Sequence, residues 1–444
     1  MIRSRSRFLL PTLVVMAFGS RLPADEPSDQ PKIVPVTRDD VKEALDQLKN
    51  RKPRFPRREP AEGERAARPR DGQGNAEGGG RRGGGGRGGF GGGGGLSRGD
   101  DPVMSLDHAF ATELFWIVSR VNNCHYCLGH QENKLLSSGL TDDQIAALDG
   151  DWERFTPAEQ AAFAFTRKLT YEPHLIGDAD IAALRQHFSE LQALEIVYFV
   201  SRYNSMNRRT DGMGLAQQAN RVFKTPTSDK YLSFKTTVAP VDPSRPAGGL
   251  APAVMARRPD LESRSEVLAR LVECRGRKPR FEMVDEARVR EVYPDWPEGK
   301  IPNYAKLLAQ FPKTGAAAAV GQRRGEESGE LAPLMRARIA WIAARHDRAW
   351  YVLGRAMAQL KALGATEDEI FALDSPDERF TPAELAAFRL TRKFATAPQL
   401  ITDADVEAVR KHYGDTVGAE IVSRNTQAAF INRLTESAGL ALEN

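Results

Sequence analysis

The sequence is short of cysteine and of long apolar runs. Its 444 residues include three cysteines, a small and odd number that excludes a disulfide-stapled exported scaffold. Beyond the N-terminus, no stretch approaches the roughly 20 apolar residues that a membrane-spanning helix needs. The formal net charge of +4 is small for this length, so a nucleic-acid partner is not expected. The length suggests two or three folded units.

The N-terminal 24 residues have the pattern of a secretory signal peptide. Arg3, Arg5 and Arg7 precede an apolar run over 8–18, and small residues follow before the acidic pair at 25–26. The run is too short to span a bilayer comfortably. We therefore expect the mature protein to be exported, either periplasmic or secreted. A short N-terminal membrane anchor is the alternative.

Residues 25–100 show little hydrophobic periodicity and are expected to be mostly disordered. Within them, 72–98 is rich in glycine and arginine. Such a segment has a large entropy to lose on ordering and little apolar surface to offset it, which indicates a flexible linker. An Arg-Gly-rich segment that binds RNA or anionic surfaces is the alternative.

The chain contains an internal repeat with an offset of 225 residues. Roughly half of the positions from 113 to 187 are identical in the second copy without a gap. Examples of the matched pairs are Trp116 and Trp341, Tyr126 and Tyr351, Gly139 and Gly364, Asp149 and Asp374, and Asn207 and Asn432. The segment 51–55 also recurs at 277–281. We predict one domain over 101–225, a linker over 226–264, and a second, degenerate domain over 265–444.

Both copies are predicted to be all-α. Capping boxes begin at Thr141 and Thr156 and at their counterparts Thr366 and Thr381, the later one in each copy with proline at the first helical position. Glycines at 139 and 364 are placed to end the preceding helices. A further helix is expected over 301–311, where the first copy has the glycine tract.

The residues with redox chemistry are the Cys-x-x-Cys pair Cys124 and Cys127, with His130 and Glu113. If Asn122 or Asn123 caps a helix, Cys124 lies in its first turn and Cys127 one turn later. The helix dipole then favours a thiolate and lowers the thiol pKa. The second thiol can form a short, reducible disulfide, and the imidazole and carboxylate can relay protons.

The second copy tests this assignment internally. Glu113 aligns with Arg338, Cys124 with Ala349, Cys127 with Val352, and His130 with Arg355. The four groups are replaced together while the packing residues around them persist. This joint replacement indicates that the four form one functional unit and that the second copy is not a redox centre.

Two alternatives remain open for the pair. In the first, the pair forms a purely structural disulfide in a non-catalytic binding or assembly protein. In the second, the pair and His130 form part of a metal site, with a fourth ligand such as His108 or His125. The remaining cysteine, Cys274, is expected to be an incidental buried thiol.

The segment from Glu113 through Cys124 and Cys127 to His130, with the later Asn207-Arg208 helix, resembles the carboxymuconolactone decarboxylase superfamily. Within it, the cysteine pair is similar to the AhpD-like alkylhydroperoxidase branch. The likeness covers about 100–225 and 295–444.

The resemblance implies a compact helical fold, pairing of the two repeats, and a homo-oligomer. It implies a hydroperoxide substrate, an external dithiol reductant, and no cofactor or metal. Cys127 would be the peroxidatic cysteine and Cys124 the resolving one, with Glu113 and a histidine shuttling protons. The family's histidine falls at Gln131, so His130 is one position early, about 100° round the helix.

Overall fold

The computed structural model describes residues 49–56, 101–122, 124–149, 152–217, 260–376, 379–398 and 401–443. The predicted signal peptide, the glycine- and arginine-rich linker and most of the linker 226–264 lie outside these ranges. Every regular element in the described ranges is helical, so the all-α prediction is confirmed. None of these helices is both long and apolar enough to cross a membrane.

Among its described residues, the first copy has six α-helices and two short 3-10 helices. Their bounds are α3 His108–Val121, α4 His125–Ser137, α5 Asp142–Ala147, η2 Trp152–Arg154, α6 Pro157–Tyr171, η3 Pro173–Leu175, α7 Asp178–Arg185 and α8 Glu190–Met213. The four longest are amphipathic or fully buried helices that surround a shared apolar core.

In the part of the chain that the structure describes, the second copy repeats this order and has four further helices before it. The added helices are α10 Arg264–Arg275, α11 Glu286–Val292, α12 Asn303–Leu308 and α13 Thr314–Glu327; the repeated ones are α14 Pro333–Asp347, α15 Trp350–Ala362, α16 Glu367–Ala372, α17 Pro382–Thr396 and α18 Asp403–Ser437. Helix α12 lies inside the range 301–311 predicted to be helical. A kink at Gly414, where φ is 72°, divides α18 into parts that match α7 and α8.

The local signals for helix ends are confirmed. All four predicted capping boxes form, at Thr141, Thr156, Thr366 and Thr381. Glycines 139 and 364 adopt φ of 95° and 89°, a left-handed conformation that ends a helix and that glycine adopts without the strain of a side chain.

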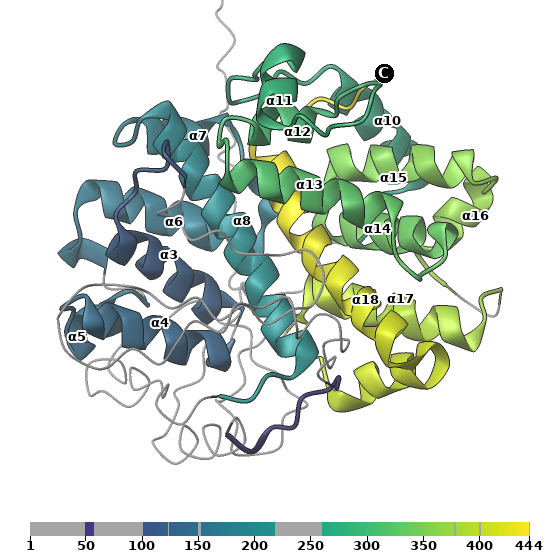
Figure 1. The fold of residues 1–444 in the computed structure, drawn as a ribbon, viewed down its shortest axis with the longest axis horizontal. Helices are drawn as coiled ribbons and strands as arrows, with labels where there is room; N and C mark the ends of the chain where they lie inside the picture. The colour runs from purple at the N-terminus through teal and green to yellow at the C-terminus, as the bar shows by residue number, and fades with distance from the viewer. Residues whose placement is uncertain are drawn as a thin grey trace, which may run out of the picture.

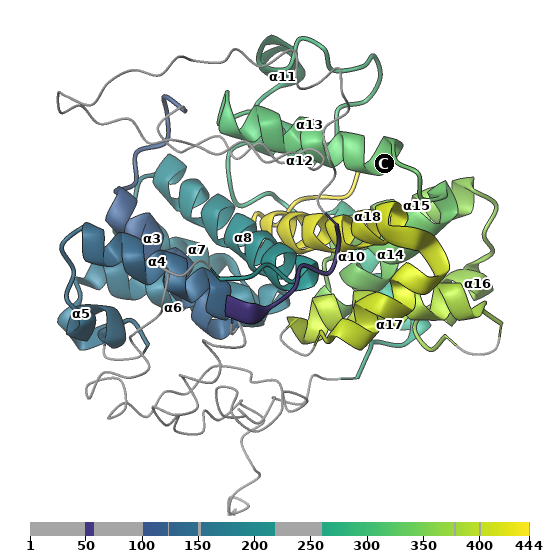
Figure 2. The ribbon, with the colours of Figure 1, turned by 60° about the horizontal axis from the view of Figure 1, so that its bottom comes forward.

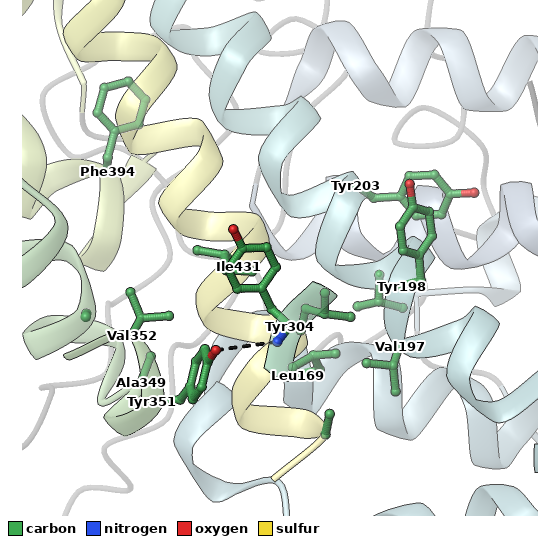
Figure 3. Close-up of a cluster of buried hydrophobic side chains, with 14 of the residues drawn as sticks. Leu169, Val197, Tyr198, Tyr203, Tyr304, Ala349, Tyr351, Val352, Phe394 and Ile431 are labelled. Atoms are coloured by element: carbon green, nitrogen blue, oxygen red, sulfur yellow. Dashed lines mark hydrogen bonds between the residues drawn. The ribbon is translucent and has the colours of Figure 1, made fainter. Parts of the chain in front are cut away.

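The two copies share one core. Helices α8 and α18 run side by side through the centre, with α3 to α7 on one flank and α14 to α17 on the other (Figure 1). Tyr198 of α8 joins them, because its ring lies 5.6 Å from Phe430 of α18 and 5.8 Å from Phe311. Figure 3 shows side chains from both copies in this buried cluster. Helix α13 lies across α18 (Figure 2).

Reciprocal contacts explain why the segment 51–55 recurs. Arg54 donates from Nε to Asp403 of the second copy at 2.7 Å, and its counterpart Arg280 donates to Asp178 of the first copy at 2.6 Å. The backbone N–H groups of the same two arginines donate to the carbonyls that end α8 and α18, of Met213 and Ala438. Each segment thus ties its own copy to the other one.

Candidate functional site

The cysteine pair lies where α3 ends and α4 begins. Asn122 is the C-cap of α3, and Cys124 is itself the N-cap of α4, with extended backbone and no side-chain cap. The Cys124 N–H donates to the Ser119 carbonyl at 2.8 Å. The prediction that an asparagine caps α4 and places Cys124 in the first turn is therefore wrong for Asn122, and Asn123 lies outside the described residues.

The two sulfurs of the pair lie 2.6 Å apart and both cysteines are free thiols. Cys124 is fully buried and Cys127 is 3% exposed. A disulfide bond is about 2.05 Å long, so the two sulfurs are close enough for a disulfide to form between them. The backbone brings the predicted pair together in a geometry that suits reversible oxidation.

Thr210 of α8 completes the sulfur environment. Its hydroxyl lies 3.1 Å from the Cys124 Sγ and 3.2 Å from the Cys127 Sγ, and it donates to the Asn207 carbonyl at 2.9 Å. Comparing the two copies of the repeat did not identify Thr210, because its counterpart in the second copy, Thr435, is also threonine. A test based on joint loss cannot find a residue that both copies keep.

Burial raises the pKa of the Cys124 thiol well above its usual range, and the thiol of Cys127 and the carboxylate of Asp211 add to this rise. The hydrogen bond with Thr210 opposes it. The predicted lowering of this pKa is wrong for Cys124, because complete removal from water costs the thiolate more than a helix N-terminus returns. Cys124 is a neutral thiol at pH 7.

A buried polar network holds α8 against the cysteine junction. The Asn122 amide donates to the side chains of Asn204 and Asn207, each at 3.0 Å, and Asn207 donates to Ser119 at 3.2 Å. Arg208 donates to Asn204 at 3.0 Å. These bonds satisfy buried groups that would otherwise be costly, and they fix the position of Thr210.

Glu113 has acidic surroundings. It is buried on α3, and in the described part of the chain no hydrogen bond links it to either cysteine. Its carboxylate instead faces the negative charges of Glu159 and Asp107. In the second copy the counterparts Arg338 and Glu384 form an ion pair. The predicted relay is therefore not made by direct contact.

His130 and Gln131 occupy neighbouring positions one turn beyond Cys127. The His130 ring packs on the Tyr126 ring, with centroids 4.6 Å apart, and Gln131 is 3% exposed. Burial and the two cysteines raise the pKa of Tyr126. Within the described ranges, no group of three or more histidine, cysteine or acidic side chains is arranged to hold a metal ion.

Glu113 predicts a pH-dependent stability. Burial, with Glu159 and Asp107, raises its pKa from 4.5 to about 8. The folded protein therefore keeps a proton that the unfolded chain releases, and the free energy of unfolding falls as the pH rises from about 4.5 to about 8. We expect the free energy of unfolding of Glu113→Gln to exceed that of the parent by roughly 2–4 kcal/mol at pH 9. Near pH 4 the two free energies should be equal.

Urea unfolding at pH 4, 7 and 9 measures this difference. The control is Glu298→Gln in an exposed loop, which should follow the parent at each pH. An equal difference between Glu113→Gln and the parent at all three pH values would contradict the assignment.

Comparisons with known proteins give distant similarities. No family model matches the chain. The uncharacterized protein YdfG of Bacillus subtilis (strain 168) is 27% identical over 100 residues, which are 22% of this chain and 68% of that protein. The crystal structure of the debrominase Bmp8 in complex with 2,3,4-tribromopyrrole matches with a TM-score of 0.31 and 15% identity, over 41% of this chain and 90% of that chain. The chain is similar to these proteins, and its likeness to the carboxymuconolactone decarboxylase superfamily stays a prediction.

Proposed function

We propose that this protein is a thiol-dependent oxidoreductase that reduces hydroperoxides through a dithiol–disulfide cycle of Cys124 and Cys127. The observation that carries the proposal is the 2.6 Å separation of two free sulfurs at the start of α4. The joint absence of both cysteines from the second copy supports it, because residues kept for packing alone persist there.

The cycle balances without a cofactor. The Cys127 thiolate attacks the terminal peroxide oxygen, the O–O bond breaks, and the alcohol leaves with a proton while Cys127 becomes a sulfenic acid. The Cys124 sulfur then attacks the Cys127 sulfur and water leaves, which forms the disulfide. An external dithiol takes part in two exchange steps, becomes a disulfide itself, and restores both thiols.

Accessibility and charge support these roles. Cys127 keeps a small exposed area, whereas Cys124 has none. The raised pKa of Cys124 keeps it a thiol until it attacks, which suits the resolving step better than the first one. The family resemblance assigns the same order.

Thr210 is expected to support the attacking sulfur. A hydroxyl has one proton, which Thr210 now donates to Asn207. Once a thiolate forms 3.2 Å away, rotation of the hydroxyl allows it to donate to the Cys127 sulfur instead. A hydrogen bond to a charged group contributes about 1.5–3 kcal/mol, so its loss disfavours the thiolate by an order of magnitude or more.

Thr210→Val is therefore predicted to slow peroxide reduction at pH 7 about tenfold, whereas Thr210→Ser keeps parent behaviour. The rate at which the reduced protein consumes cumene hydroperoxide at pH 7 measures this effect. The matched control is Thr435→Val in the second copy. The same rate in Thr210→Val as in the parent would remove Thr210 from the mechanism.

Proton transfer is assigned to His130 before Glu113. His130 is one turn beyond Cys127 on α4, whereas Glu113 is held among acidic groups on α3. Glu113 is neutral at pH 7, so it holds a proton. It can pass that proton to the sulfurs only through other groups. An exported location and a dithiol reductant of that compartment belong to the same proposal.

Thiol counting tests the proposed reaction. Reduced protein is mixed with cumene hydroperoxide without a reductant, and both remaining thiols and remaining peroxide are measured. We expect two thiols lost for each peroxide consumed, with Cys274 still free. Consumption of peroxide without thiol loss, or thiols that never react, would overturn the proposal.

A further inference from the structure

The second copy contains a cavity where the first copy has its cysteines. Its volume is about 780 Å³, within the range of small-molecule pockets. Val352, the counterpart of Cys127, and Arg355, the counterpart of His130, line it, with Tyr304 and Tyr351 alongside. Figure 3 shows Tyr304 and Tyr351 joined by the hydrogen bond from the Tyr304 N–H to the Tyr351 hydroxyl. The cavity therefore occupies the position of the lost redox centre.

Three helices give this cavity apolar walls. Helices α14, α15 and α18 each contribute small or branched side chains: Ile339, Ala340, Val352, Ala356, Ala428 and Ile431. A ligand with an apolar body can bury its surface against them.

The same three helices each add an arginine. Arg336 comes from α14, Arg355 from α15 and Arg424 from α18. The aligned residues of the first copy are Ala111, His130 and Phe199. The second copy has thus lost both thiols and gained these three arginines at one cavity, whose lining also includes Arg275 and the side chains of Glu326, Glu327 and Glu443.

These arginines differ in their charge partners. Arg355 pairs with Glu326 at 2.9 Å and with Glu443 at 3.6 Å, and Arg424 pairs with Glu420 at 2.6 Å. Arg336 donates to the carbonyls of Leu331 and Glu327, at 3.1 and 3.3 Å, and has no carboxylate partner among the described residues.

Arg336 and Arg424 repel each other. Burial and the positive charge of Arg424 lower the pKa of Arg336, and the carboxylate of Glu420, which pairs with Arg424, partly opposes this. An anionic group between the two guanidinium groups would relieve this repulsion and accept their hydrogen bonds.

We propose that the cavity of the second copy binds a small organic carboxylate with an apolar body, with the carboxylate at Arg336 and Arg424 and the body against α14, α15 and α18. The inference does not depend on the proposed peroxide chemistry. It gives the degenerate copy a function as a binding site for a small amphiphilic anion.

Calorimetric titration of the full chain with octanoate tests the proposal, with octan-1-ol as the uncharged probe of equal chain length. We expect saturable octanoate binding at one site, at least tenfold tighter than octanol. In the double variant Arg336→Gln/Arg424→Gln, octanoate binding should be at least tenfold weaker and octanol binding less than twofold weaker than in the parent. Val352→Trp, which places a larger side chain in the cavity, should weaken the binding of both probes at least tenfold.

Two controls separate this site from the rest of the chain. Arg389→Gln, an exposed arginine of the same copy, and the double variant Cys124→Ser/Cys127→Ser should bind octanoate like the parent. Thermal unfolding of each variant checks that it is folded. No saturable octanoate binding, equal binding of both probes, or binding unchanged in Val352→Trp would overturn the proposal.

Discussion

Cys127→Ser is expected to abolish hydroperoxide reduction, with a loss of at least a thousandfold in turnover measured with a dithiol reductant. The serine hydroxyl is a far weaker nucleophile than a thiolate and cannot form a sulfenic acid or a disulfide. The other thiol of the pair, Cys124, is fully buried and its pKa is raised. It cannot take over the attack at neutral pH.

Cys124→Ser should give a different defect. Cys127 still attacks the peroxide, so one equivalent is consumed rapidly and a sulfenic acid accumulates, which dimedone labels. Turnover then stops, because no neighbouring thiol closes the disulfide. Cys274→Ser, which removes a buried thiol whose Sγ lies 3.6 Å from the Leu440 carbonyl, should keep parent activity. Full turnover in Cys127→Ser would refute the assignment of this residue.

Gly212→Val is expected to destabilise the protein by about 3 kcal/mol or more. A Cβ at Gly212 would lie 2.6 Å from the Phe394 ring and 2.8 Å from Val422, both in the second copy. Overpacking of this kind costs about 1–3 kcal/mol for small intrusions, and valine adds two more carbons. The gain in helix propensity over glycine is about 0.5 kcal/mol, too small to offset the clash.

Chemical unfolding monitored by circular dichroism measures this change. The control is Gly276→Ala, where the nearest atom to a new Cβ is 3.6 Å away and φ is −87°; its stability should stay within about 0.5 kcal/mol of the parent. Parent stability in Gly212→Val would mean that α8 and the second copy do not approach each other as closely as described.

Features set by neighbouring residues were predictable. The capping boxes at Thr156 and Thr381, and the helix ends at Gly139 and Gly364, depend on side chains and dihedrals within a few positions of one another. The repeat also indicated that two similar helical units follow each other.

Features set by distant contacts were not predictable. Thr210 reaches the sulfurs from a helix 83 residues beyond Cys127, and no spacing rule places it there. The sign of the Cys124 shift depends on complete burial, which tertiary packing alone decides. Glu113 was assigned to the site because it is replaced together with the two cysteines in the second copy. The charged groups that act on it are nevertheless carboxylates, those of Glu159 and Asp107. Joint replacement indicates that residues were lost together, but it does not establish that they are in contact.

The reduction potential of the Cys124–Cys127 pair tests the central claim most directly. Equilibration in dithiothreitol or glutathione redox buffers, with the oxidised and reduced forms separated after alkylation, gives the value. The account predicts a potential between about −270 and −120 mV, the range of catalytic thiol–disulfide pairs. A potential below about −300 mV, typical of structural disulfides, or sulfurs that never form the bond, would contradict it.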